Sequence, residues 1–391
     1  MSSPRFNRAL SLRHVRWFEV DWHVLIIALA LMAMGLVFLD AMDGSLSNQG
    51  QGDAFLRPHL QKVLLTSPLL LVGMCLRPSW VRRHAGLLYG ATLVLLCLVP
   101  IIGDERNNAR RWIQLPKFDL QPSELAKLGV ILMLAKLLHR NRLRDVGDWV
   151  RPIMVALVPM GLVVLQPDLG TALTIVPVAF GMFYLAGARA RTLFGLSILV
   201  VFAGFFAVQA GLVRGYQLKR IDTWASSWEP EGLIAQRNRL GFHVYHARTG
   251  IGNGGTLGAG LGQGIANETG YLPERDSDSI FAVIAEESGF FGGSALLFLY
   301  LVLVVSLMVS AAGLRDRFAR LVVGGVGLYF AAHVFINVSV NLGILPMTGL
   351  TLPLLSTGGS SLLTTFLALG LALGLASHHE LSLDRDAFRT F

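Results

Sequence analysis

Five carboxylates lie close together in a short stretch where a polar loop runs into an apolar helix. The stretch is Tyr271 to Glu287, YLPERDSDSIFAVIAEE, and its acids are Glu274, Asp276, Asp278, Glu286 and Glu287. A carboxylate serves as a general base when the fold holds it beside a reacting hydroxyl. Asp278 stands where the loop becomes the helix, so its backbone should be the best fixed. Glu286 would lie about 12 Å deeper along that helix, which predicts that Glu286 and Glu287 are paired inside the bundle, in a structural role.

A second group combines arginines with a charged pair. The sequence RNNARRWI places Arg110 and Arg111 beside Trp112. Guanidinium groups suit phosphate or pyrophosphate, but arginines next to an interfacial Trp can equally well reach lipid headgroups. Glu124 and Lys127, in QPSELAK, share one face of a helix at a spacing of i and i+3. Ionised groups at membrane depth usually pair and face a cavity, and a purely structural salt bridge is the alternative.

Three further segments have unusual compositions. Asp168, in QPDLGT, follows a helix-ending proline and can either cap the next helix or hold a lysine or arginine. Residues 252–264 are rich in glycine but lack the Lys-Ser/Thr and the preceding strand of a phosphate loop, so we expect a shaped re-entrant or interfacial element. Prolines and glycines in residues 343–361 break the helix at membrane depth, where irregular backbone must line a wet cavity or be buried. Asn337 and Asn341 should face that cavity or bridge helices.

The composition is that of a membrane protein. Of 391 residues, 53% are hydrophobic and only 15% are charged, and the mean hydropathy is +0.57. A soluble domain carries about 25% charged residues. The pI of about 9.9 comes from basic residues in short segments between apolar runs, which argues against a nucleic-acid-binding face. Cys75 and Cys97 both fall in apolar runs, so we expect no disulfide.

Apolar runs predict an all-α fold of about ten transmembrane helices. The expected spans are 23–41, 61–76, 86–103, 123–138, 152–165, 169–187, 192–213, 279–310, 319–341 and 361–377. Residues 1–391 should form a single integral membrane domain, with a long extracytoplasmic loop, 214–278, between the seventh and eighth spans. The short basic connections and both termini fall on one side, which the positive-inside rule makes cytoplasmic. Nearly all the polar motifs described above then face the outside.

The order of these motifs resembles that of a known family. RRWI, QPSELAK, QPDLGTAL, the glycine-rich segment followed by LPExxxDxIFAVIAEExGF, and NLGILPMTGLTLPLLSTGGSSLL follow one another over nearly the whole chain. They resemble the SEDS family of shape, elongation, division and sporulation proteins. LPER and AVIAEE are more similar to the elongation member, RodA, and TGLTLPLLS to the division member, FtsW; the RodA resemblance is favoured.

The resemblance implies a peptidoglycan glycosyltransferase, which polymerises lipid II by inverting glycosyl transfer and releases undecaprenyl pyrophosphate. The family works at the outer face of the bacterial cytoplasmic (inner) membrane, with a class B penicillin-binding protein and other elongation-complex membrane proteins. It uses no organic cofactor, and a divalent cation, Mg²⁺ or Mn²⁺, is expected to assist. The essential aspartate of the family maps to Asp278. Substrate binding is assigned to Arg110, Arg111, Glu124, Lys127, Asp168, Glu274 and Ser360.

The chain departs from the family pattern near Asp278. Ser279 replaces a usual Phe, which should thin the apolar packing behind the acid. Asp276 replaces a frequent His, and an added acidic neighbour can raise the pKa of a carboxylate. Residues 241–248, GFHVYHAR, also differ from the family, so no substrate contact is carried over to them.

Two other functions fit part of these observations. Broken helices and intramembrane charges also suit a flippase for lipid-linked precursors, although a flippase needs polar groups along a path to both faces. A non-catalytic scaffold for the penicillin-binding protein would tolerate replacement of Asp278. A third alternative is a lipid II polymerase that acts in division or sporulation and not in elongation.

Overall fold

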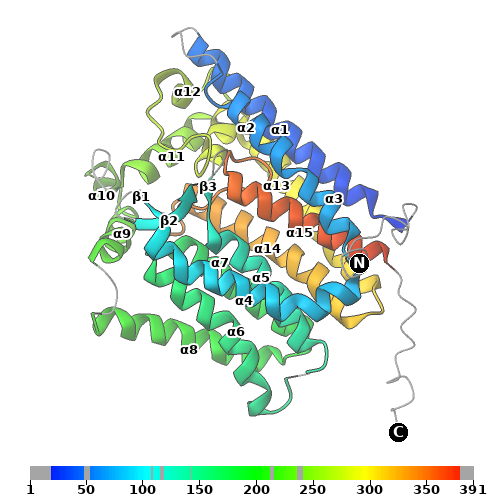
Figure 1. Ribbon diagram of the computed structural model, residues 1–391. Coiled ribbons are helices and arrows are strands. Elements are labelled where there is room, and N and C mark those ends of the chain that lie inside the picture. The colour runs from blue at the N-terminus through cyan, green and yellow to red at the C-terminus, as the bar shows by residue number, and fades with distance from the viewer. Residues whose placement is uncertain are drawn as a thin grey trace.

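The computed structural model describes residues 19–47, 53–106, 109–114, 119–141, 143–211, 215–235 and 241–378. Long helices lie side by side, and short helices and strands cover one end of the bundle (Figure 1). The basic N-terminal segment and the basic tail, on which part of the predicted orientation rests, lie outside the described residues.

Every predicted span contains a helix. The bounds are α1 (Trp22–Ser47), α4 (Pro78–Ile102), α5 (Pro122–Leu138), α6 (Val146–Leu165), α7 (Leu169–Leu185), α8 (Ala190–Gln209), α13 (Ile280–Gly313), α14 (Arg317–Asn341) and α15 (Gly359–Ser377). The second span is two helices, α2 (Leu56–Thr66) and α3 (Pro68–Cys75), because Pro68 starts a new helix. Among the described helices, α1, α4, α6, α13, α14 and α15 are long and apolar enough to cross a membrane. The predicted multi-pass, all-helical fold is confirmed.

Several helices begin earlier than hydropathy predicts, because polar residues cap them. Asp145 and Asp148 form a capping box that starts α6 at Val146, before the predicted boundary at Pro152. Asp316 accepts from the backbone N–H groups of Phe318 and Ala319 and starts α14 in the same way. Hydropathy reports the apolar part of a helix, so it omits such polar first turns.

The segment between α4 and α5, expected as a loop, contains a small antiparallel sheet. Its strands are β1 (Asp104–Arg106), β2 (Ala109–Gln114) and β3 (Asp119–Leu120), in the order β1-β2-β3. Ile113 pairs with Leu120, which brings the end of β2 beside the start of α5. Asn107 and Asn108, part of the arginine motif, lie outside the described residues. Strands this short leave too little periodicity for sequence patterns to reveal.

The described part of the long segment between α8 and α13 contains four short helices. It contains α9 (Gly215–Ser226), α10 (Pro230–Ala235), α11 (Phe242–Asn253) and α12 (Ile265–Thr269). These helices and the sheet lie at the same end of the bundle (Figure 1). At this end the chain therefore has enough ordered polar structure to enclose a site.

The centre of the bundle is packed through glycines. A Cβ on Gly370 of α15 would lie 2.1 Å from the carbonyl oxygen of Leu70 in α3. A Cβ on Gly73 of α3 would lie 2.7 Å from the backbone nitrogen of Leu371. Such contacts are possible only where side chains are absent, and they let helix backbones approach closely in a membrane.

Helix α13 is broken at Gly289, and a glycine-rich loop fills the break. Gly289 has φ +67°, and a Cβ there would lie 2.4 Å from the backbone nitrogen of Gly258. Backbone bonds join residues 255–260, here called the glycine loop, to both sides of the break: Ala259 N donates to Glu286 O at 3.0 Å, and Phe290 N donates to Gly255 O at 2.9 Å. The glycine loop thus has a defined shape and supplies the partners that a broken helix lacks. Its re-entrant or interfacial position stays a prediction.

Glu286 and Glu287 have the structural contacts that the sequence predicts, but they do not bind each other. The Glu286 carboxylate accepts from the backbone N–H of Ala266 at 3.0 Å, and the Glu287 carboxylate accepts from the amide of Asn267. Both carboxylates are buried, and together they hold α12 against α13.

Candidate active site

A polar cavity of about 780 Å³ lies at the end of the bundle that carries the sheet and helices α9–α12. It is formed by β2, β3, the starts of α5, α7 and α15, the loop before α13 and the irregular segment 347–358. The predicted site residues that line it are Arg111, Glu124, Asp168, Glu274, Asp278 and Ser360. Motifs separated by more than two hundred residues in sequence thus share one cavity.

Asp278 is fixed through its backbone, which leaves its carboxylate to the cavity. The side-chain amides of Asn337 and Asn341 both donate to the carbonyl oxygen of Asp278, at 2.9 and 3.0 Å. Asn337 and Asn341 therefore bridge helices as predicted, and the group that they hold is the backbone of the acid. Gly349, with φ +72°, lies opposite, and a Cβ there would be 3.4 Å from Asp278 Oδ2. Among the described residues, the Asp278 carboxylate has no hydrogen-bond donor.

The surroundings of Asp278 favour its protonated form. Its pKa is raised to about 7, first by burial and then by the negative charges of Glu274 and Asp276, while Arg220 acts in the opposite direction. A carboxyl group with a pKa near the working pH can accept and release a proton readily. Asp276 itself turns away, since its carboxylate accepts from the hydroxyl of Thr357.

Behind the cavity, three buried side chains form a chain of contacts. Lys127 Nζ donates to Glu124 Oε1 at 2.7 Å and lies 2.7 Å from His333 Nε2. Glu124 lines the cavity, whereas Lys127 lies one step deeper, 5.5 Å from the centroid of the Tyr329 ring. Glu124 Oε2 is buried without a partner among the described residues. Sequence analysis missed His333, although an ionisable residue inside an apolar span was the signal that could have revealed it.

Asp168 and Arg111 build the turn between α6 and α7. The Asp168 carboxylate accepts from Gln121 Nε2 at 2.8 Å, Ser123 Oγ at 3.1 Å and the backbone of Thr171 at 3.2 Å. The capping alternative for Asp168 is therefore confirmed, and its described bonds include no lysine or arginine. Arg111 donates to the carbonyl oxygens of Gln166 and Pro167, at the end of α6.

Arg110 and Ser360 are placed differently from the expectation of direct substrate contact. The Arg110 side chain is exposed, lies outside the cavity lining and is 3.5 Å from Glu105. Ser360 does line the cavity, but its hydroxyl donates to Asp119 O and accepts from Gln121 N at 2.8 Å. Ser360 thus attaches β3 to the start of α15.

Among the described residues, three cationic side chains line the cavity, and two of them were not predicted. Lys62 donates to Thr357 O at 2.9 Å, Arg220 donates to Met347 O at 3.1 Å, and Arg111 completes the set. The start of α15 also faces the cavity, and its N-cap residue, Gly358, makes no side-chain cap. Cations beside a helix N-terminus form a suitable environment for a phosphate or diphosphate group.

Ser279 and His243, which both lie where the chain departs from the family pattern, contact each other. Ser279 Oγ lies 3.0 Å from His243 Nε2, and both side chains are buried. Burial lowers the pKa of His243 to about 4, with further lowering by Arg220 and His246, so the imidazole is neutral at pH 7. His243 of α11 thus provides a polar partner for the shorter side chain, and the expectation of thinner apolar packing behind the acid stays a prediction.

We expect Ser279→Phe alone to destabilise the protein by about 1–3 kcal/mol, because the larger ring overpacks a site that His243 already fills. The double variant Ser279→Phe with His243→Ala should recover most of that loss. Ser279→Ala is the matched control, since it removes only the hydroxyl. Thermal unfolding of the three purified variants measures the coupling, and equal losses in the single and double Phe variants would contradict it.

Comparison with known proteins identifies the family. Residues 21–381 match the family model that groups FtsW, RodA and SpoVE, described as "Cell cycle protein". The chain belongs to the FtsW/RodA/SpoVE family. The SEDS resemblance of its motifs is thereby confirmed.

Relatives of this FtsW/RodA/SpoVE protein match over almost their whole length. A protein of Trichlorobacter lovleyi with the name "Probable peptidoglycan glycosyltransferase FtsW" is 34% identical, over 94% of this chain and 96% of its own. A Coxiella burnetii protein of the same name is 31% identical, over 94% and 98%.

Two solved structures are also similar. One comes from work titled "Structural coordination of polymerization and crosslinking by a peptidoglycan synthase complex", with TM-score 0.78 and 32% identity over 96% of this chain and 100% of that chain. The other is rod shape determining protein RodA of Thermus thermophilus, with TM-score 0.68 and 31% identity over 96% and 99%. Relatives named FtsW thus match this chain over nearly its whole length, and a solved RodA structure shares its fold.

Proposed function

We propose that this protein is a peptidoglycan glycosyltransferase that polymerises lipid II into glycan strands. The observation that carries the proposal is the cavity in which Asp278, a carboxyl group with a pKa near 7, lies with cationic side chains and a helix N-terminus. The names of the relatives support the same activity. The direct test is polymerisation of purified lipid II by the purified protein, with glycan strands separated by gel electrophoresis.

In this mechanism, Asp278 accepts the proton of the acceptor 4-hydroxyl as that oxygen attacks the anomeric carbon of the donor sugar. The new glycosidic bond forms as the bond from that carbon to the diphosphate oxygen breaks, with inversion. The leaving undecaprenyl pyrophosphate gains negative charge, which Lys62, Arg111 and the start of α15 offset. Glu124 holds Lys127 close behind the cavity wall, where its charge adds to theirs.

The lipid tails need apolar grooves that reach the site. An apolar cavity of about 460 Å³ lies between α3, α4, α5 and α15, lined by residues such as Val72, Leu88 and Leu132. Helix α5 lines this apolar cavity, and the first turn of the same helix places Glu124 at the polar cavity. We propose that a polyprenyl chain lies there while its diphosphate reaches the cationic side chains.

We propose that the site faces the outside of the bacterial inner membrane and that both termini are cytoplasmic. At the end of the bundle away from the site, Arg82 and Arg83 lie in the first two turns of α4, and Arg140 and Arg189 lie in connections between helices. This charge bias supports a cytoplasmic position for that end. A labelling reagent that cannot cross membranes should reach a cysteine placed at Glu274 in intact spheroplasts.

The proposed divalent cation would depend on substrate for its ligands. Among the described residues, no group of three His, Cys, Asp or Glu side chains is arranged to hold a metal. Mg²⁺ can bind through one or two carboxylates together with substrate phosphates and water. Asp278 and Glu274 both line the cavity and could supply these one or two carboxylate ligands. The cation would neutralise diphosphate charge there.

We also propose a class B penicillin-binding protein as partner, acting on the strands that this chain makes. A similar solved structure bears a title that couples polymerisation and crosslinking in one complex, which supports this pairing. The polymerisation assay should therefore be run with and without such a partner.

The cellular role that we propose is elongation and shape, in contact with elongation-complex membrane proteins. LPER and AVIAEE support it, and the fold shared with RodA is consistent with it. Division is the second candidate, because TGLTLPLLS and the FtsW name of the curated relatives favour it. Depletion of the protein in its host separates the two, since loss of elongation gives round cells and loss of division gives filaments.

The rate of polymerisation should rise with pH and level off above about pH 7, because Asp278 must lose its proton to act as a base. Glu274 raises the pKa of Asp278, so Glu274→Gln should move the rising limb to lower pH. Ser277→Ala is the control, because it alters the same loop without changing charge. Polymerisation rates measured in buffers from pH 5 to pH 9 test this. If the rate of Glu274→Gln rises over the same pH range as wild type, the Glu274 charge does not raise the pKa of Asp278.

A further inference from the structure

A second cavity lies at the opposite end of the bundle and is dominated by arginines. It has a volume of about 740 Å³ and is formed by the turn before α6, the turn between α7 and α8, and the first turn of α14. Helix α7 runs from Asp168 in the candidate active site to Ala186 in this cavity, about 25 Å away along its axis. The proposed transferase reaction assigns no role to this cavity.

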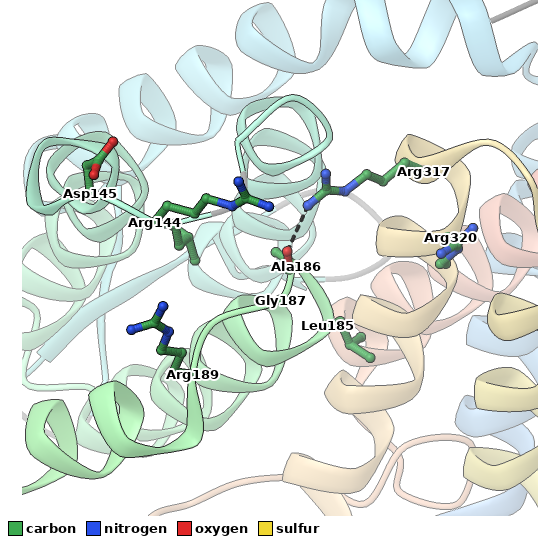
Figure 2. A pocket seen from close by; sticks show the side chains of 9 residues that line it. Arg144, Asp145, Leu185, Ala186, Gly187, Arg189, Arg317 and Arg320 are labelled. Atoms are coloured by element: carbon green, nitrogen blue, oxygen red, sulfur yellow. Dashed lines mark hydrogen bonds between the residues drawn. The ribbon is translucent and has the colours of Figure 1, made fainter. Parts of the chain in front are cut away.

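The charges that line the cavity are unbalanced. Arg144, Arg189, Arg317 and Arg320 line it, and Asp145 is the acid among its lining residues. The Asp145 carboxylate already caps the first turn of α6. Figure 2 shows the side chains of Arg144 and Arg317 pointing toward one another above Ala186. Like charges that face each other across a cavity repel, and an anion between them removes that cost.

The arginines divide into two pairs with different surroundings. Arg317 donates to Ala186 O at 2.7 Å and to Asn141 O at 3.1 Å, and Arg320 donates to Leu314 O at 2.8 Å. These two arginines cap helix ends and fix the walls. Arg144 and Arg189 are exposed, and their side chains have no acceptor within the part of the chain that the structure describes. Their guanidinium groups are available to an incoming ligand.

We propose that this cavity binds a phosphate group, carried either by an anionic phospholipid headgroup or by free phosphate. Guanidinium groups bind phosphate oxygens through paired N–H donors. Basic pockets between membrane helices hold anionic headgroups by the same chemistry. Beside the cavity, Tyr184 and Phe194 expose 62% and 69% of their surfaces, which gives acyl chains an apolar face next to the arginines.

The test follows the thermal unfolding of the purified protein in a neutral detergent as ligand is added. The ligands are dioctanoyl phosphatidylglycerol, dioctanoyl phosphatidylcholine and inorganic phosphate. The cavity variant is Arg144→Gln with Arg189→Gln. The matched control is Arg83→Gln with Arg151→Gln, which removes two exposed arginines near the starts of α4 and α6 without touching the cavity.

The wild-type unfolding temperature should rise saturably with phosphatidylglycerol and not with phosphatidylcholine. The cavity variant should need at least about tenfold more ligand, since each basic side chain contributes roughly fivefold near an anionic lipid. The control should respond as wild type does. A saturable response to inorganic phosphate would support free phosphate as the source, and its absence would support the lipid. No saturable response to either anion, or equal losses in the cavity variant and the control, would overturn the proposal.

Discussion

Asp278→Asn should abolish glycan polymerisation, with a fall in rate of about 10²- to 10⁴-fold, the usual contribution of a general base. The amide has nearly the shape of the carboxyl group, so the backbone bonds from Asn337 and Asn341 remain. What it loses is the ability to accept a proton from the acceptor hydroxyl. Polymerisation of purified lipid II measures the effect.

Asp276→Asn is the matched control. It removes an equal charge two residues from Asp278, and the Asp276 carboxylate binds Thr357. Folding can be checked independently through unfolding temperature. The pKa of Asp278 is raised from 3.8 to about 7 in the folded protein, so its ionisation lowers the free energy of unfolding between about pH 4 and pH 7, and the full cost is present above pH 7. Asp278→Asn should therefore be at least as stable as wild type at pH 8. A folded Asp278→Asn protein that polymerises at the wild-type rate would refute the assignment of Asp278 as the base.

Lys127→Met should have the largest effect on stability. Lys127 is buried between Glu124 and His333, and removing one member of a buried charge pair typically costs about 3–5 kcal/mol, because the other charge is left without a partner. The double variant Glu124→Gln with Lys127→Met removes both charges and should recover much of the loss. Lys136→Met, near the other end of α5, is the control, since Lys136 donates only to a carbonyl oxygen at 3.2 Å.

These variants also separate the two interpretations of the Glu124–Lys127 pair. If the pair is only a structural salt bridge, the stable double variant should polymerise lipid II normally. If the pair contributes to substrate binding or catalysis, the double variant should fold but lose activity, because Glu124 lines the cavity and holds Lys127 behind it. A double variant as unstable as Lys127→Met would show that the two charges are not coupled.

Much of the fold could be predicted from the sequence, because crossing a membrane imposes long apolar helices. Pro167 placed one boundary, since α6 ends just before it and α7 begins just after it. The break at Pro68 was missed, because the predicted span 61–76 ran through it. The small sheet and helices α9–α12 could not be predicted in the same way. Their short, polar segments are stabilised by contacts with distant residues, such as the bond from Ser360 to Asp119.

For the candidate site, the sequence indicated the acids and missed part of the positive charge. Asp278 and Glu124 stood out because carboxylates are rare beside apolar runs. Lys62 and Arg220 carried no such signal, since basic residues are common between spans. Only the fold shows that α2 and α9 bring them to one cavity, where Thr357 and Met347 provide carbonyl partners.

The break at Gly289 has a consequence for how the protein is made. As one uninterrupted helix, α13 would extend about 50 Å, well beyond the hydrocarbon core of about 30 Å. Residues 290–313 alone are long enough to cross, and the apolar turns before Gly289 are held inside the protein, where residues 280–287 are buried. The glycine loop provides that hold, and because it precedes α13 in the chain it emerges from the ribosome first. The loop that pairs with both sides of the break is thus already synthesised when α13 is made.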